Sequence, residues 1–443
     1  MAQTLPATSP RTRILVVGGG YVGMYTALRL QKKLKRELRR RTVEVIVVDP
    51  RSYMTYQPFL PEAAAGSLEP RHVVVPLRRV LPRCEVLNGR VGRVDHARRV
   101  ARIEPTRGDA FDLTYEHIVM SPGSIARTLP IPGLAEMGIG FKQVEEAITL
   151  RNQVLEKLDI AASITDRHLK RCVLTFVFVG GGYAGIEALA ELEDMARYAT
   201  RYYEDISPDD LRFVLVEASG RILPEVGDDL GRYTVEELRK RNIEVRLNTR
   251  LESCVGGHIV LSDGEEFDAE TLVWTAGVKA HPMLADTDLP VDDKGRVRCR
   301  PDLRVEGLDG AWAAGDGAAV PDLTNPGQMC SPSAQHAVRQ AKQLGTNIAL
   351  VLHGRTTDAY IHKHVGSVAS LGLHKGVAQV YGIKLRGFPA WFMHRTYHVS
   401  RVPTFNRKVR VILDWTLALF FKREVVSLGS LQNPRGEFSE ASR

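Results

Sequence analysis

The amino-acid sequence predicts an α/β protein in which one strand–turn–helix unit occurs twice. A β-branched strand runs directly into a glycine-rich turn at residues 13–23, and another strand does the same at residues 172–185. Each turn is followed by a helical pattern and by a second strand that ends in an acidic residue. This alternation is typical of parallel sheets covered by helices. The length of 443 residues exceeds what one core needs and predicts two or three domains.

The first unit begins with the strand at residues 13–17. The three glycines of its turn are Gly18, Gly20 and Gly23. In such a turn one glycine permits the tight bend, one lets a pyrophosphate approach the backbone, and one allows the helix to pack closely on the strand. The next strand, Val43–Val48, ends in Asp49, whose carboxylate suits the hydroxyl groups of a ribose. The basic stretch at residues 29–41 lengthens the connection beyond the ~20 residues that are usual.

The second unit lies in the middle of the chain and starts with the strand Cys172–Val179. Its three glycines are Gly180, Gly182 and Gly185. The following strand, Phe213–Val216, ends in Glu217. Two such units predict two dinucleotide sites, each with phosphates at a helix N-terminus. Glu217 would bond a free 2′-hydroxyl and repel a 2′-phosphate, which favours NADH over NADPH, whereas Arg221 leaves NADPH open as an alternative.

Three further strings fit the same architecture. They are IVMSPG at 118–123, LVWTAGV at 272–278 and AWAAGD at 311–316. Each is a short apolar strand that ends in small residues, as required where the backbone lies against a cofactor. Gly123, Gly277 and Asp316 are therefore added to the candidate cofactor-binding residues.

Charge and cysteine content narrow the functional classes. The net charge is +8, and residues 384–423 alone carry nine basic residues against one acid. These basic residues alternate with aliphatic runs and form no nucleic-acid recognition module, so no nucleic-acid partner is expected. The five cysteines contain no CxxC pair, which argues against a disulfide framework, a metal site or a dithiol motif. With no secretory signal at residues 1–10, we expect an intracellular protein.

The C-terminal part combines apolar and basic residues. Residues 409–421 form an apolar segment bracketed by cations, far shorter than the ~20 residues that cross a bilayer. Upstream, one helical face is predicted to carry Phe388, Trp391, Phe392, Val399 and Val402, with His394, Arg395, His398 and Arg401 largely elsewhere. This pattern favours a helix lying at an anionic membrane surface. A dimerisation helix, or a helix packed on the first domain, is the alternative.

Several longer strings resemble one family. They are RSYMTYQPFLPEAAAGSLEP at 51–70, GGGYAGIEALAEL at 180–192, VEASGRILP at 216–224, SAQHAVRQ at 333–340 and GFPAWF at 387–392. Together they are similar to the type II NADH:quinone oxidoreductases, also called alternative NADH dehydrogenases, over nearly the whole chain. The chain departs from the family at Arg339, beside Gln340, where a second glutamine is usual.

The resemblance implies two Rossmann-like dinucleotide-binding domains in a glutathione-reductase-like arrangement, plus a C-terminal amphipathic membrane-contact region. The implied FAD-binding domain covers residues 11–138 and 284–352, and the NADH-binding domain covers residues 139–283. The implied C-terminal domain, with its membrane-anchoring helices, covers residues 353–443. Asp316 matches the family aspartate that binds the ribityl chain of FAD.

The implied activity is oxidation of NADH through FAD with transfer of two electrons to a membrane quinone, without proton pumping, at the cytoplasmic face of the cell membrane. The candidate catalytic residues are Glu187, Gln335 and Lys375. Glu187 matches a glutamate that couples flavin and quinone chemistry, although a first-turn acid also suits the helix dipole. Gln335 is expected at the flavin edge and the quinone. Lys375 either pairs with Glu187 or supplies a proton, with an exposed surface lysine as the alternative.

Other functions stay open at this stage. A sulfide:quinone or ferredoxin reductase shares the superfamily, but sulfide chemistry needs facing cysteines. A flavoprotein that changes conformation on NADH binding, without a fast acceptor, belongs to a different class. The quinone, the effect of Arg339 and a homodimer are likewise undetermined by the sequence.

Overall fold

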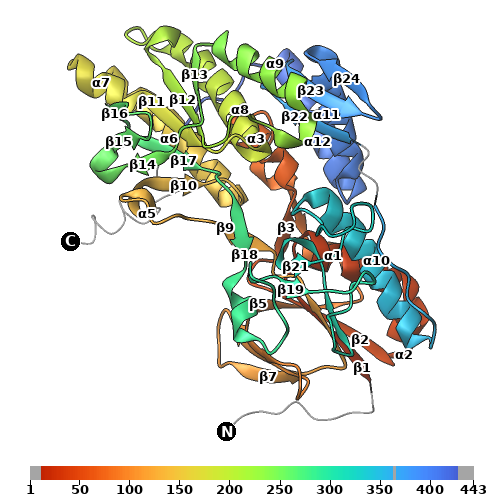
Figure 1. The fold of residues 1–443 in the computed structure, drawn as a ribbon. Coiled ribbons are helices and arrows are strands. Elements are labelled where there is room, and N and C mark those ends of the chain that lie inside the picture. Colours follow the sequence, from red (N-terminus) through yellow and green to blue (C-terminus); the bar gives the residue numbers. More distant parts are fainter. Residues whose placement is uncertain (1–10, 363–365, 428–443) are drawn as a thin grey trace, which may run out of the picture. The chain divides into compact units, whose positions relative to one another are not determined.

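The computed structural model describes residues 11–362 and 366–427. Its contacts divide the chain into two units, each assembled from separate stretches of sequence (Figure 1). Unit 1 comprises Met1–Met54, Val75–Ile125 and Val278–His364. Unit 2 comprises Thr55–Val74, Ala126–Gly277 and Val365–Arg443.

Unit 1 is built on a seven-stranded sheet. In spatial order its strands are β20 (Ala311–Ala313), β8 (His117–Met120), β1 (Thr12–Val17), β2 (Val43–Asp49), β5 (Glu85–Asp95), β6 (Val100–Pro105) and β7 (Phe111–Thr114). The strands from β20 to β5 pair in parallel, and β5, β6 and β7 pair antiparallel. Helix α1 (Tyr21–Lys33) and the short helix α2 (Lys35–Arg40) connect β1 to β2, and the basic stretch that lengthens this connection is divided between them.

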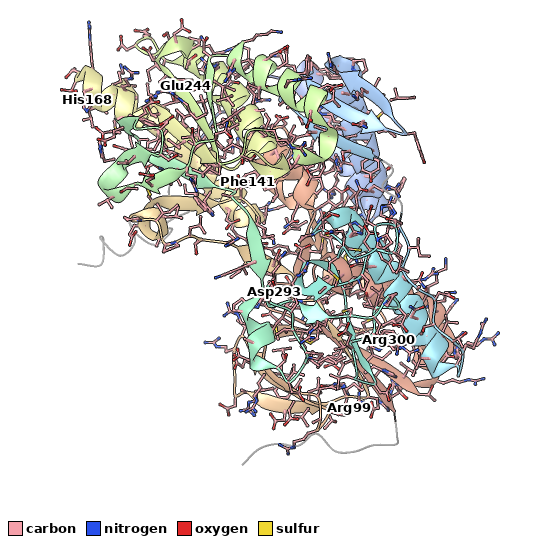
Figure 2. All side chains as sticks on the ribbon, viewed as in Figure 1. Arg99, Phe141, His168, Glu244, Asp293 and Arg300 are labelled. Carbon is pink, nitrogen blue, oxygen red and sulfur yellow. The ribbon has the colours of Figure 1, made fainter. Side chains whose placement is uncertain are left out.

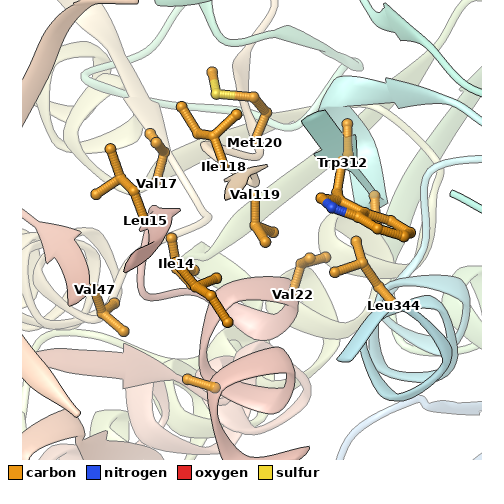
Figure 3. Packing of buried hydrophobic residues seen from close by; sticks show 14 of the residues in the cluster. Ile14, Leu15, Val17, Val22, Val47, Ile118, Val119, Met120, Trp312 and Leu344 are labelled. Atoms are coloured by element: carbon orange, nitrogen blue, oxygen red, sulfur yellow. The ribbon is translucent and has the colours of Figure 1, made fainter. Parts of the chain in front are cut away.

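Helix α10 (Ala334–Leu352) packs closely on α1. The hydroxyl group of Thr26 donates to the carbonyl oxygen of Ala341 at 3.3 Å. Gly345 permits this approach, because a Cβ there would lie 2.8 Å from the Cβ of Arg29. Ile14, Val22, Trp312 and Leu344 belong to one buried apolar cluster between the sheet and these helices (Figure 3).

Unit 2 contains a five-stranded parallel sheet. In spatial order its strands are β10 (Gly138–Gly140), β17 (Thr271–Trp274), β11 (Thr175–Val179), β12 (Arg212–Glu217) and β13 (Ile243–Leu247). Helix α8 (Tyr183–Ala199) leads from β11 toward β12, and α9 (Asp228–Arg239) connects β12 to β13. Figure 2 labels Glu244 on β13, at the edge of this sheet, where it accepts from Arg212 at 2.7 Å. The repeated α/β unit expected from the sequence is therefore confirmed.

The strand that precedes the second glycine turn is shorter than predicted. Residues Arg167–Val173 form helix α7, so Cys172 is helical and the strand starts at Thr175. The carboxylate of Asp166 caps α7 by accepting from the backbone N–H of Leu169 at 2.9 Å. This local capping outweighs the β-branched pattern that the sequence continues upstream.

The two contact units divide the chain differently from the predicted domain boundaries. Residues 55–74, expected with the FAD-binding domain, group with unit 2 because helix α3 (Leu60–Ala64) packs against α8 and α6 (Val144–Ala162). Residues 366–427 also group with unit 2, whereas residues 353–362 group with unit 1. The expected separate C-terminal domain is thus not a separate contact unit.

The C-terminal part of unit 2 contains a small antiparallel sheet and two helices. The sheet consists of β22 (Gly366–Ser370), β23 (Gly376–Val380) and β24 (Ile383–Arg386), and the helices are α11 (Phe388–Arg401) and α12 (Phe405–Phe420). No helix among residues 11–362 and 366–427 combines the length and apolar character needed to cross a membrane.

The predicted apolar face of α11 is wrong. Phe388 and Phe392 are exposed, but Trp391 is buried, and Val402 beyond the helix is buried too. His394 and Arg395, expected on the polar side, are also buried. The reason is tertiary, because Arg395 finds an acidic partner inside unit 2.

Candidate active site

The glycine turn of unit 1 is required by the backbone itself at its first and last positions. Gly18 has φ +93°, and a Cβ there would lie 2.4 Å from the carbonyl oxygen of Ser121. A Cβ on Gly23 would lie 1.8 Å from the carbonyl oxygen of Gly18. Gly20 differs, because a Cβ there would meet no protein atom within 4 Å. Packing within the protein therefore does not explain Gly20, whereas close approach of a bound pyrophosphate does.

The turn of unit 2 repeats this pattern. Gly180 has φ +116°, and its Cβ would lie 2.9 Å from the backbone nitrogen of Ala276. Gly185 would place a Cβ 2.0 Å from the carbonyl oxygen of Gly180, and Gly182 would meet nothing within 4 Å. Gly20 and Gly182 are the N-cap residues of α1 and α8, and neither helix has a side-chain cap. Both N-termini can thus donate backbone N–H groups to a phosphate.

In each unit, the acidic residue at the end of the second strand accepts a backbone N–H group of the glycine turn. Asp49 accepts the backbone N–H of Gly19 at 2.6 Å and that of Arg51 at 2.7 Å. Burial raises the pKa of Asp49, and these two hydrogen bonds oppose the rise. Each carboxylate oxygen keeps a further lone pair with which it can accept from a ribose hydroxyl.

Glu217 repeats these contacts in unit 2. It accepts the backbone N–H of Gly181 at 2.6 Å and that of Ser219 at 2.7 Å. Arg221 pairs with Asp228 and donates to the carbonyl oxygen of Pro224 at 2.7 Å. The guanidinium of Arg221 is thus already bonded within the protein, which favours NADH at this site.

The remaining candidate cofactor residues lie at strand ends. In unit 1, Ser124 donates to Asp316 at 2.6 Å, which orients the carboxylate that was matched to the ribityl position. Gly123 has φ +76°, and Gly277, in unit 2, has φ +93°. A Cβ on either glycine would meet no protein atom within 4 Å.

Glu187 is buried in the first turns of α8. Its Oε1 accepts the backbone N–H of Ser370 at 2.9 Å and lies 3.0 Å from Nε2 of His394. Burial raises the pKa of Glu187 to about 8, although the hydrogen bond from Ser370 opposes this rise. The carboxyl group is therefore protonated at pH 7 and can donate a proton.

The pair between Lys375 and Glu187, one of the alternatives for this lysine, is not formed among the described residues. Lys375 is half-buried in the turn between β22 and β23, and none of its contacts within the described residues is to Glu187. His394, which the sequence placed on a polar face, takes that position instead. The only sequence signal for His394 was a histidine on a helix rich in aromatic residues.

Two more buried acids lie near Glu187, and sequence reasoning missed both. Glu62 on α3 accepts from Arg395 at 3.0 Å and from the indole N–H of Trp415 at 2.6 Å. Glu191, one helical turn after Glu187, accepts from the hydroxyl group of Ser370 at 3.0 Å. Burial raises the pKa of both. We call Glu62, Glu187 and Glu191 the buried acid cluster.

Gln335 lies in the first turn of α10, in unit 1. Arg339, one turn later, donates to its Oε1 at 3.3 Å and also contacts His362. The departure from the family pattern therefore has a local role, because Arg339 orients the amide group of Gln335. Gln335 belongs to unit 1, whereas Glu187 and Lys375 belong to unit 2.

All five cysteines are free thiols. Burial raises the pKa of every one of them: Cys84, Cys172, Cys254, Cys299 and Cys330. Because the thiolate is the reactive form, none is poised for dithiol or sulfide chemistry at neutral pH. The structure thereby weakens the sulfide reductase alternative.

The glycine geometry predicts opposite results for two neighbouring substitutions. Gly23→Ala should lower the thermal stability of the apoprotein, because its Cβ overlaps the carbonyl oxygen of Gly18. Gly20→Ala should leave apoprotein stability unchanged and weaken FAD binding by about 10-fold or more, a cost above ~1.4 kcal/mol. Thermal denaturation and FAD titration of both variants measure this. Equal loss of stability in the two apoproteins would contradict it.

Comparisons with known proteins agree with this geometry. A family model described as pyridine nucleotide-disulphide oxidoreductase matches residues 12–341. The type II NADH:quinone oxidoreductase Ndh of Mycobacterium tuberculosis is 26% identical over 440 residues, covering 95% of this chain and 91% of that protein. The mitochondrial internal alternative NAD(P)H-ubiquinone oxidoreductase A1 of Arabidopsis thaliana is 28% identical, covering 94% and 85%.

Among solved structures, NDH2 from Plasmodium falciparum in complex with NADH has a TM-score of 0.85 at 18% identity, covering 94% of this chain and 100% of that one. This likeness shows the fold. The similarity to type II NADH:quinone oxidoreductases seen in the sequence is thus confirmed. With two glycine turns, an acid that accepts a backbone N–H group of each turn, and a family match over most of its length, the chain belongs to the pyridine nucleotide-disulphide oxidoreductase family.

Proposed function

We propose that this protein is an FAD-dependent NADH:quinone oxidoreductase, which oxidises NADH and passes two electrons to a membrane quinone without pumping protons. The observations that carry the proposal are two matching dinucleotide turns, one in each unit, and a buried carboxyl group in unit 2, that of Glu187, which is neutral at pH 7. The names of the relatives from Mycobacterium tuberculosis and Arabidopsis thaliana support quinone as the acceptor.

The residues of unit 1 fit FAD. The turn from Gly18 to Gly23 receives the pyrophosphate, Asp49 binds the adenosine ribose, and Asp316, oriented by Ser124, binds the ribityl chain. When bound, FAD supplies the redox chemistry that the side chains lack. Gln335, with its Oε1 engaged by Arg339, presents its amide N–H groups to the flavin edge or to the quinone.

The residues of unit 2 fit NADH. The turn from Gly180 to Gly185 receives its pyrophosphate, Gly277 lies against it, and Glu217 binds the ribose. Glu187 donates a proton during quinone reduction, because its carboxyl group is neutral and buried. Among the residues that the structure describes, Lys375 makes no contact to Glu187, so we assign it to the surface of unit 2.

The two C-terminal helices suit a membrane surface. Exposed apolar residues on α12 are Phe405, Val409, Ile412, Leu413, Leu417, Leu419 and Phe420, while only Val411 of this helix is buried. Phe388 and Phe392 on α11 are exposed as well. Such a surface with nearby cations is typical of peripheral attachment, which brings the enzyme to its lipid-soluble acceptor at the cytoplasmic face.

Nucleotide preference should depend on Glu217. Glu217→Gln keeps an oxygen that accepts from Gly181 but removes the negative charge that repels a 2′-phosphate. We expect the ratio of kcat/KM for NADH over NADPH to fall by about 10-fold, equivalent to ~1.4 kcal/mol. Arg221→Gln is the matched control and should leave the ratio unchanged. A change in the control alone would show that Arg221 selects the nucleotide.

The central test separates the two half-reactions by stopped-flow absorbance. NADH should bleach the flavin of the FAD-loaded protein, and a soluble quinone should restore it. Glu187→Gln should keep flavin reduction and slow reoxidation by roughly 10²-fold, the scale of general acid catalysis. In the wild type, reoxidation should decline as the pH rises through about 8, because Glu187 then loses its proton.

In Glu187→Gln, the rate of quinone-dependent reoxidation should not decline as the pH rises through about 8. Bleaching without recovery by any quinone would overturn the proposed acceptor and favour a protein that responds to NADH without fast turnover.

Membrane attachment is tested by flotation with phosphatidylglycerol-containing vesicles. The wild type should float with the vesicles, and Leu413→Glu with Leu417→Glu should prevent it, because both side chains are about half exposed on α12. Leu323→Glu, on an exposed loop position of unit 1, is the control. If the double variant instead changes a dimer into a monomer and vesicle binding is absent throughout, the helix is a dimer interface.

A further inference from the structure

Glu187 and His394 form a buried pair of neutral groups. Nε2 of His394 lies 3.0 Å from Oε1 of Glu187, and both side chains are buried. Burial raises the pKa of Glu187 to about 8 and lowers the pKa of His394 to about 3. At pH 7 the contact therefore joins a protonated carboxyl group and a neutral imidazole, and it is not an ion pair.

The imidazole of His394 is poorly satisfied by its surroundings. Its Nε2 is close to Glu187 but lacks the angle of a hydrogen bond, and Nδ1 has no partner among the described residues. Leaving two buried nitrogens unbonded costs free energy, so a leucine or phenylalanine would fill this space more favourably. A histidine at this position needs a reason other than packing.

A second histidine lies next to His394 on α11. His398 follows His394 by one helical turn on α11, and their ring centroids are 4.5 Å apart. Its Nδ1 lies 3.3 Å from the hydroxyl group of Tyr56. His398 is only half-buried, in contrast to His394. The two rings therefore connect a buried acid to a more accessible position on the same helix.

The proposed reaction requires such a connection. NADH, one proton and a quinone give NAD⁺ and a quinol, so the hydride brings two electrons and one hydrogen, and solvent must supply the second hydrogen. If Glu187 delivers that proton, its carboxylate must be reprotonated once in every turnover, although burial separates it from water.

We propose that His394 and His398 form a proton relay that returns a proton to Glu187 after each quinone reduction. The proposal rests on the proposed function. The Nε2–H of His394 gives its proton to the carboxylate while Nδ1 takes one from the side of His398. This exchanges the tautomer of the ring and leaves no charge on it. A neutral imidazole suits this transfer because both of its nitrogens take part.

Several charged groups act on the relay and on the buried acid cluster beside it. Glu62 on α3 and Glu191 on α8 are acidic, while Arg395 on α11 and Arg423 beyond α12 are basic, and all act on the cluster electrostatically. Arg395 lowers the pKa of His394 further, which keeps the ring neutral. The surroundings therefore favour passage of a proton over its retention on the histidine.

The test uses the FAD-loaded, full-length protein and the two half-reactions. His394→Gln and His398→Gln should reduce flavin with NADH at rates within twofold of wild type, and quinone-dependent reoxidation should slow by about 10-fold or more. Added imidazole should restore part of that rate in His394→Gln. Because the relay is serial, the double variant should be no slower than the slower single variant. Thr396→Ala, an exposed position of α11, is the matched control.

Results that contradict these expectations distinguish failure of the relay from failure of the proposed function. If His394→Gln is reoxidised at the wild-type rate, the relay is wrong and the proposed function stands. Equal slowing of both half-reactions with a lower melting temperature and no imidazole rescue would show that His394 is structural. If no quinone reoxidises the wild type, the proposed function fails and the relay fails with it.

Discussion

The approach of the first helix to the first strand sets the geometry on which each unit depends. In unit 1 the backbone at Gly23 comes so close to the carbonyl oxygen of Gly18 that only a hydrogen fits between them. Gly185 and Gly180 repeat the contact in unit 2. This approach places the helix N-terminus directly after the strand, where no side chain caps its backbone N–H groups and a phosphate could accept from them. Asp49 and Glu217 then stabilise the turns by accepting their backbone N–H groups.

The buried acid cluster is a second constraint, and it belongs to unit 2. Three carboxyl groups, Glu62, Glu187 and Glu191, are buried, while Arg395 is the cation that bonds one of them directly. Burying several negative charges with so little compensation is unfavourable, and burial accordingly raises the pKa of all three carboxyl groups. Glu187, with a pKa of about 8, keeps its proton at neutral pH. Glu62 joins α3 to α11 through Arg395 and to α12 through Trp415.

Local patterns in the sequence predicted the parts of the fold that are determined locally. The glycine spacing and the acid at the strand end were sufficient for both dinucleotide turns, because these contacts involve residues close in sequence. The position of Arg395 was not predictable, because its partner Glu62 lies 333 residues away. His394 was misplaced for a related reason. Aromatic residues lie on two sides of α11, so periodicity alone did not show which side faces the core.

The same ion pairs change the interpretation of the basic C-terminal segment. Residues 384–423 carry nine basic residues against one acid, which favours contact with anionic lipid. In the structure Arg395 is used internally by Glu62, and Lys384 pairs with Asp229. Fewer cations are thus available to anionic lipid than the composition suggests. Most apolar side chains of α12 are exposed within the described part of the chain, so in the proposed attachment their burial would supply the larger driving force. The strength of binding should then depend less on ionic strength than a purely electrostatic contact would.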